Sequence, residues 1–134
     1  MLGVRLTELG SEAILCHLDK DMNQTAGKHF NWAIIRLGNI VREAKIYDVS
    51  PEEGDRFFWT QCLVGDPTDN IKGVPGIGKV KAEAILRDCN GNQECYEAVK
   101  NAFACEEELD MNAQCIYIWR KPNDSWRSLL APGA

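Results

Sequence analysis

The sequence predicts an α/β fold that is mainly helical and includes a helix-hairpin-helix. Three observations lead to this expectation. A short apolar run, Ala13 to Leu18, predicts a buried strand, and it is followed by an aspartate. A serine, a proline and a glutamate mark the start of a long amphipathic helix, and a glycine-rich turn separates that helix from a second one. With 134 residues and 45% hydrophobic content, the chain can bury a core of its own.

The N-terminal third combines a helix end, one strand and a hairpin. Residues Val4 to Leu9 read as the end of a helix that Gly10 stops. The apolar run Ala13 to Leu18 predicts a buried strand, whose carboxyl end would deliver Asp19 to the edge of a sheet where ligands gather. The segment from Lys28 to Asp48 is aromatic and β-branched and is broken at Gly38-Asn39, so we expect a hairpin there.

The next helix has a well-defined start. Ser50 can cap it, Pro51 suits the first turn, and Glu53 completes a capping box. We expect it to run to about Leu63 and to end at Gly65. Its apolar face would contain Phe57, Phe58, Cys62 and Leu63.

Three further helices are expected in the remainder of the chain. One begins near Lys79, and the other two lie around Glu94 to Phe103 and Glu107 to Arg120. The apolar side of the first would consist of Val80, Ala84, Ile85 and Leu86. The sequence thus divides into an α/β part with a hairpin over residues 1–50, a helical part with the helix-hairpin-helix over 51–120, and an irregular tail over 121–134.

The glycine-rich turn predicts an anion site. In Val74 to Lys79 two glycines bracket one apolar residue, which allows a tight turn with outward-facing N–H groups. A helix that begins near Lys79 would add its positive N-terminal dipole. The same region holds a basic patch of Lys72, Lys79, Lys81 and Arg87. The alternative for these lysines is an ordinary solvated helix face.

Two pairs of aspartates predict a metal site. Asp19 and Asp21 follow the proposed strand, and Asp66 and Asp69 are spaced by one helical turn. Four converging carboxylates repel one another unless cations lie between them, and such hard oxygen ligands suit Mg²⁺ or Mn²⁺. Two of these ions about 3.5–4 Å apart are the usual device for phosphodiester cleavage. The alternative is a polar loop at Asp19 and Asp21, with Asp66 acting as a cap.

Two other metal sites are disfavoured. The segment that begins at Asp19 imitates an EF-hand loop, but Gln24 replaces its glycine and Phe30 its bidentate glutamate. The six cysteines contain no C-x-x-C pair, which argues against zinc. Three of them lie in apolar patterns, where a buried free thiol is expected: Cys16, Cys62 and Cys115.

Composition narrows the class of protein. The net charge of −5 means that any contact with nucleic acid depends on a local patch and not on the whole surface. No apolar run approaches the roughly 20 residues that span a bilayer. Residues Met1 to Arg5 lack the apolar region of a secretory signal. We therefore expect a cytoplasmic protein without a membrane association.

Three motifs in order resemble those of the 5′-nucleases, the family of flap endonucleases, the nuclease domain of bacterial DNA polymerase I and bacteriophage 5′–3′ exonucleases. Leu18 to Gln24 is similar to the family's D-K-D-[LM]-x-Q segment, and Gly65 to Asn70 to its G-D-x-x-D-N segment. Gly73 to Gly78 resembles the G-V-P-G-I-G of its helix-three-turn-helix. The accompanying Gly27 to Trp32 looks most like the phage enzymes.

The resemblance implies roles for these residues. Asp19, Asp21, Asp66 and Asp69 would be catalytic carboxylates that hold Mg²⁺ or Mn²⁺ beside a PIN-like sheet. The turn would hold duplex DNA with a 5′ end or flap through its phosphates, and in some family members this turn also binds K⁺ through backbone carbonyls. The residues implied in DNA binding are Gly73, Val74, Gly76, Ile77, Gly78, Lys79 and Lys81. Such contacts would be independent of base sequence.

Comparison with the family pattern also indicates that this sequence lacks the family's N-terminal acidic motifs. Family members begin with a strand that bears an aspartate and continue through further acidic motifs, which this sequence does not contain. The chain therefore resembles the C-terminal portion of a 5′-nuclease, and we expect it to be inactive or nearly so unless a missing N-terminal half completes it. The alternative function is a non-catalytic DNA-binding helix-hairpin-helix module. A pure protein-interaction domain has little support.

Overall fold

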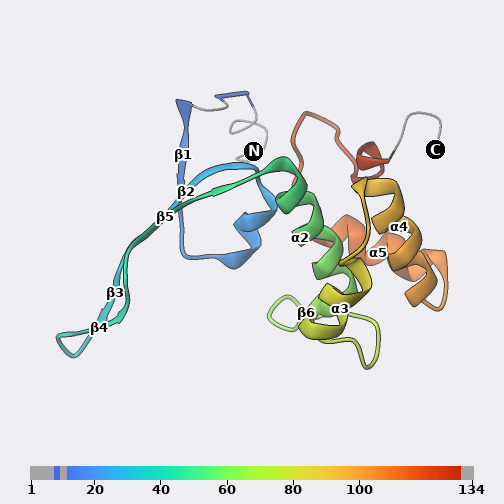
Figure 1. The fold of residues 1–134 in the computed structure, drawn as a ribbon, viewed down its shortest axis with the longest axis horizontal. Helices are drawn as coiled ribbons and strands as arrows, with labels where there is room; N and C mark the ends of the chain where they lie inside the picture. The colour runs from blue at the N-terminus through green and yellow to red at the C-terminus, as the bar shows by residue number, and fades with distance from the viewer. Residues whose placement is uncertain (1–7, 10–11, 131–134) are drawn as a thin grey trace.

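The computed structural model describes Glu8, Leu9 and residues 12–130 (Figure 1). The predicted helix over residues 4–9 lies outside the described residues except for Glu8 and Leu9, which are helical. The described part has an N-terminal sheet region, from which a hairpin projects, and a helical region that follows it (Figure 1). Among the described residues, no helix combines the length and hydropathy that a bilayer crossing requires.

The N-terminal sheet has the strand order β1-β2-β5. Strand β1 (Ile14–Cys16) pairs in parallel with β2 (Gly27–Asn31), which pairs antiparallel with β5 (Lys45–Val49). The prediction of a buried strand over residues 13–18 was wrong in extent and in part of its burial, because the strand covers three residues and Ile14 is 55% exposed, while Leu15 and His17 are buried. Within the described residues β1 has one strand neighbour, β2, so its other edge has no strand partner there.

The predicted hairpin is confirmed, with more subdivision than the sequence indicates. Beyond β2 and β5 the chain continues into β3 (Ile34–Arg36) and β4 (Asn39–Arg42), a separate antiparallel pair that extends away from the body (Figure 1). Leu37 and Gly38 both have positive φ at the turn, which matches the twist of a tight hairpin. Leu37 is completely exposed.

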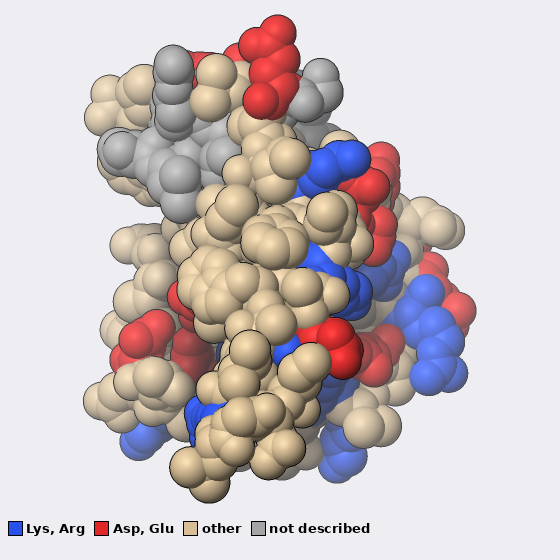
Figure 2. Space-filling view, turned by 90° about the vertical axis from the view of Figure 1, so that its left-hand side faces the viewer, with Lys and Arg blue, Asp and Glu red and all other residues tan. Residues whose placement is uncertain are grey.

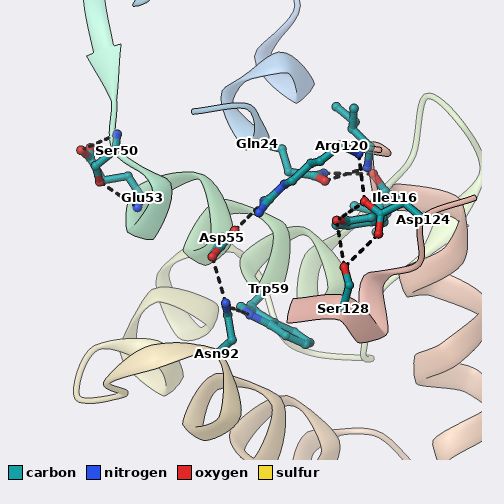
Figure 3. Close-up of polar contacts among 12 residues, drawn as sticks. Gln24, Ser50, Glu53, Asp55, Trp59, Asn92, Ile116, Arg120, Asp124 and Ser128 are labelled. Carbon is teal, nitrogen blue, oxygen red and sulfur yellow. Dashed lines mark hydrogen bonds and ion pairs between the residues drawn. The ribbon is translucent and has the colours of Figure 1, made fainter. Parts of the chain in front are cut away.

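Helix α2 (Pro51–Val64) confirms the predicted helix and its cap. The Ser50 hydroxyl accepts from the Glu53 N–H at 3.0 Å, and the Ser50 N–H donates to the Glu53 carboxylate at 3.2 Å (Figure 3). Further along the helix, Asp55 accepts from Arg120 and from Asn92, and thereby joins α2 to two later segments (Figure 3).

The core forms where three helices pack on α2. These are α3 (Lys79–Leu86), α4 (Gly91–Ala102) and α5 (Glu106–Ile116). Helix α2 contributes a fully buried set of Phe58, Trp59, Cys62 and Leu63. Phe57, which the sequence places on the same face, is partly exposed, and the buried Trp59 was not predicted.

The tail is more ordered than the sequence indicates. The 3₁₀ helix η3 (Trp126–Leu129) inserts Trp126, which is 1% exposed, beside Trp59 and Tyr96. The indole N–H of Trp126 donates to Asp110 at 2.9 Å, so the one polar atom of the ring is satisfied. Part of the helical core therefore comes from beyond residue 120.

Two helix predictions need correction. The predicted apolar face of α3 is correct for Leu86, which is fully buried, and for Ile85, which packs against the core. It is wrong for Val80, which is 80% exposed, and for Ala84, which is exposed, and the buried Ala82 was not predicted. Helix α5 ends at Ile116 instead of Arg120.

The early end of α5 has a clear cause in the Gln24 side chain. Its amide donates to the Ile116 carbonyl at 3.0 Å and accepts from the Ile118 N–H at 2.7 Å, and Tyr117 between them is extended (Figure 3). This pair of hydrogen bonds replaces the helical ones that the sequence alone would predict.

The cysteine prediction is correct at one position of three. All six thiols are free, and Cys62 is buried as expected, but Cys16 and Cys115 are exposed. Burial raises the pKa of Cys95 to about 11, which makes that thiol a small apolar core residue.

A backbone crossing follows α2. Strands β6 (Gly65–Asp66) and β7 (Ile71–Lys72) fold the chain back on itself, and the Val74 N–H donates to the Leu63 carbonyl at 2.8 Å. A Cβ at Gly65 would lie 2.3 Å from the Gly73 nitrogen, and a Cβ at Gly73 would lie 2.3 Å from the carbonyl group of Val64. Both positions therefore require glycine for steric reasons.

We expect Gly73→Ala to destabilise the chain by at least about 3 kcal/mol, because backbone atoms cannot move aside as a flexible side chain can. The matched control is Gly78→Ala. Gly78 has φ −94° and open space around its Cβ position, so this change should cost no more than about 1 kcal/mol, the usual disadvantage of alanine relative to glycine at a helix N-cap. Urea denaturation of both variants checks the contrast, and equal effects would contradict the crossing as described.

Candidate metal and phosphate site

The four predicted aspartates line one cleft of about 200 Å³. Its walls come from the 3₁₀ helix η2 (Lys20–Gln24), the end of α2, strand β6 with the turn after it, and the C-terminal end of α5. The side chains that complete the cleft are Met22, Gln61, Ile71, Cys115, Ile116 and Ile118. The fold thus brings together two acidic segments that lie more than 40 residues apart in the sequence.

Three of the aspartates converge closely. One carboxylate oxygen each of Asp21, Asp66 and Asp69 lies within 4.8 Å of the other two. Asp66 is 5% exposed, Asp21 is half-buried and Asp69 is exposed, so the cluster opens toward solvent on one side. The Thr68 N–H donates to the Asp66 carboxylate at 3.0 Å and fixes its orientation.

Asp19 lines the cleft without joining this trio. It is the N-cap of η2, and its carboxylate accepts from the Asp21 N–H at 2.9 Å. That hydrogen bond gives Asp19 a local structural role, as the alternative interpretation of the D-x-D segment requires. Asp66, by contrast, caps no helix and lies at the end of α2.

Burial and the like charges around it both affect the Asp21 carboxyl group. Burial raises the pKa of its carboxyl group, and the neighbouring charges of Asp19 and Asp66 raise it further. The hydrogen bond from Gln61 acts in the opposite direction. The cluster therefore resists carrying its full negative charge unless a cation is present.

A buried polar group holds η2 against the sheet. His17 and His29 are joined at 2.7 Å through Nε2 and Nδ1, and the other nitrogen of His29 lies 2.7 Å from the Thr25 carbonyl. The Tyr47 hydroxyl donates to Asn23 at 2.5 Å. Since Asn23 and Thr25 flank the end of η2, these contacts position Asp21. Sequence reasoning did not identify this group, although two histidines at the edges of strand patterns were visible.

Within the glycine turn, some residues pack against the core and others are exposed. The N–H groups of Val74 and Ile77 donate to the Leu63 and Val74 carbonyls, and both side chains pack against the core. Gly76 and Gly78 are exposed, and a Cβ at either would meet nothing within 4 Å. Gly76 has φ +80°, which favours glycine, but Gly78 has no such requirement from its own backbone or surroundings.

Helix α3 begins directly after this turn. Its N-cap is Gly78, and no side chain caps its first N–H groups. Lys79 and Lys81 in its first turn are exposed, and in the part of the chain that the structure describes neither forms an ion pair. Free donors and positive charge therefore meet at the start of α3.

Comparison with curated proteins identifies relatives. A 5′-3′ exonuclease of Buchnera aphidicola subsp. Schizaphis graminum is 30% identical over 74% of this chain and 34% of its own length. DNA polymerase I of Bacillus caldotenax is 31% identical over 81% of this chain and 12% of its own length. Flap endonuclease Xni of Shewanella halifaxensis is 26% identical over 82% of this chain and 46% of its own length.

The chain spans less than half the length of each of these relatives. No family model matches it, and no solved structure matches it significantly. The relatives' names agree with the family that the three sequence motifs resemble, and the motifs lie at the cleft and at the turn just described. These relatives support the assignment of the chain to the 5′–3′ exonuclease and flap endonuclease family.

Proposed function

We propose that this chain supplies part of the metal site and the DNA-backbone clamp of a 5′–3′ exonuclease or flap endonuclease that hydrolyses phosphodiester bonds. The observation that carries the proposal is the convergence of Asp21, Asp66 and Asp69 in one cleft. A DNA-binding module without catalysis has no need of carboxylates there, because they would repel phosphate. The relatives' names support nuclease ancestry, and the activity of the whole enzyme is part of the proposal.

The residues present fit a small divalent cation. All three converging groups are carboxylates, which suit Mg²⁺ or Mn²⁺, and the raised pKa of Asp21 reflects a charge that a cation would neutralise. Bound cations of this kind activate water and stabilise the charge on phosphate oxygens. Asp21, Asp66 and Asp69 would hold them, and Asp19 would complete the wall as an outer carboxylate.

The turn and α3 fit a phosphate. Gly76 and Gly78 leave the backbone open to close approach, and the uncapped start of α3 offers N–H donors with the positive end of the helix dipole. Lys79 and Lys81 would add phosphate contacts. Gly73, Val74 and Ile77 would shape the turn instead of touching DNA, since they pack on the end of α2. The K⁺ implied by the family resemblance would use the carbonyls of this turn.

A further part of the nuclease would cover the exposed side of the sheet. Parallel strands are usually buried on both faces, yet Ile14 is 55% and Ile46 is 65% exposed on one face of β1 and β5. The side of the molecule from which the hairpin projects carries a broad uncharged area (Figure 2). The missing N-terminal half, with its own acidic residues, would cover these residues.

The metal proposal predicts a stability contrast. A carboxyl group whose pKa is raised by folding stabilises the protein below its unfolded pKa and loses that contribution as the pH rises. Asp21→Asn should therefore raise the Tm of the metal-free chain by a few degrees at pH 7.5, with a smaller gain near pH 4. Mn²⁺ should raise the Tm of the wild type more than that of Asp21→Asn, which keeps Asp66 and Asp69 but lacks one carboxylate.

Asp88→Asn, at an exposed position between α3 and α4, serves as the control for that experiment. Differential scanning calorimetry with and without Mn²⁺ gives the readout. If Mn²⁺ leaves the Tm of the wild type unchanged, the proposal that the three carboxylates bind a divalent cation is contradicted.

The clamp proposal predicts a loss of affinity that does not depend on base sequence. Lys79→Ala and Lys81→Ala should each weaken duplex binding about equally for unrelated sequences and reduce the slope of log affinity against log salt by about 1. Lys100→Ala, at an exposed position on α4, is the control. Fluorescence anisotropy at several salt concentrations measures these slopes, and unchanged slopes for both variants would place the DNA elsewhere.

The catalytic proposal predicts that this chain by itself hydrolyses 5′-ended duplex DNA slowly or not at all, because only part of the carboxylate set is present. Addition of the N-terminal half of a related nuclease in trans should restore cleavage that requires Mg²⁺ or Mn²⁺. Asp66→Ala should abolish the restored activity. Robust metal-dependent cleavage by the purified chain alone, abolished by Asp66→Ala, would contradict the expectation of an incomplete site.

A further inference from the structure

Gln61 touches the acidic cluster and was not singled out by the sequence motifs. It lies in the last turn of α2, four residues before Gly65, and faces the cleft that the aspartates line. Its side-chain amide N–H donates to an Asp21 carboxylate oxygen at 2.6 Å. Helix α2 therefore leads along the chain to Asp66, and through Gln61 it also hydrogen-bonds to Asp21, which lies in η2.

The other end of the same amide lacks a donor. The Gln61 Oε1 atom is buried and has no hydrogen-bond partner among the described residues. A buried carbonyl oxygen without a donor is unfavourable, and most such oxygens in proteins are bonded to protein groups or to ordered water. The cleft beside it is lined by carboxylates and apolar side chains, so the chain itself offers few donors there.

Neutrality is the second property of Gln61. A lysine at this position would place a positive charge where a cation is expected, and a glutamate would repel Asp21. An amide can donate to a carboxylate and accept from water without a change in the charge of the cluster. Outer partners of this kind orient metal ligands, and their removal typically weakens metal binding by about 10–100-fold.

We propose that Gln61 is a positioning residue of the metal site. Its N–H holds Asp21 in the orientation that converges with Asp66 and Asp69, and its Oε1 accepts a hydrogen bond from a water molecule bound to the cation. This inference rests on the proposed function, since it assumes that the cluster binds Mg²⁺ or Mn²⁺. With this role for Gln61, the last turn of α2 contributes to metal affinity as well as to the packing of the core.

The test measures the affinity of the purified 134-residue chain for Mn²⁺ by electron paramagnetic resonance. Gln61→Met keeps the length and helix propensity of the side chain and removes both amide functions, so the affinity should fall by about tenfold. Gln61→Asn, which keeps the amide but is one methylene too short to reach Asp21, should show a similar fall. This second variant stays polar and guards against a loss that comes from altered packing.

The matched control is Gln114→Met. Gln114 also donates from a helix to an aspartate, at 2.7 Å to Asp110, but on the exposed surface of α5 outside the cleft. Its replacement should leave the Mn²⁺ affinity unchanged.

A double-mutant cycle separates positioning from a general structural effect. If Gln61 acts mainly through Asp21, Gln61→Met should weaken binding clearly less in an Asp21→Asn background than in the wild type, because only the contact of Oε1 with the bound water remains to be lost. In an Asp69→Asn background, where the Gln61 contact to Asp21 is intact, the fall of about tenfold should remain.

The outcomes distinguish the two claims. If the wild type binds Mn²⁺, Asp66→Ala weakens binding and both Gln61 variants bind as the wild type does, the role of Gln61 is overturned and the proposed metal site stands. Equal effects of Gln61→Met in both backgrounds would also overturn the positioning role. If the wild type binds no Mn²⁺, or Asp66→Ala binds it equally well, the metal site and the role of Gln61 both fall.

Discussion

The close approach of two glycines at the end of α2 is the constraint on which the rest of the site depends. Gly65 and Gly73 bring their backbones into direct contact, so the segment between them closes into a small loop with Asp66 and Asp69 on it. The chain then leaves Gly73 directly into the turn that starts α3. One backbone crossing thereby sets the acidic residues and the glycine turn at fixed positions relative to the same helix.

Polar side chains join the N-terminal sheet region to this helical framework. Gln24 bridges the two backbone groups that flank Tyr117, and Gln61 of α2 donates to Asp21 of η2. Because Gln24 is the last residue of η2, the bridge also fixes the segment that carries Asp21. These side-chain amides therefore hold the segment that carries Asp21 against the helices that carry the rest of the acidic cluster.

The sequence predicted those features that depend on neighbours in the chain. The capping box of α2, the start of α3 at Lys79 and the hairpin break near Gly38 are local, and all are confirmed. The burial of Ala82 in α3, the end of α5 and the burial of Trp126 depend on contacts with distant residues, so periodicity could not give them. Gln61 was missed because a single polar residue in an apolar helix face has no signature until its partner Asp21 is placed.

The crossing of Gly65 and Gly73 also has an evolutionary consequence. In an ordinary packed core, a larger residue at one position can be tolerated when its neighbour becomes smaller. Here each residue faces backbone, and neither has a side chain that could be reduced. No compensating substitution exists at the partner position, so we expect both glycines to persist while the sequence around them diverges.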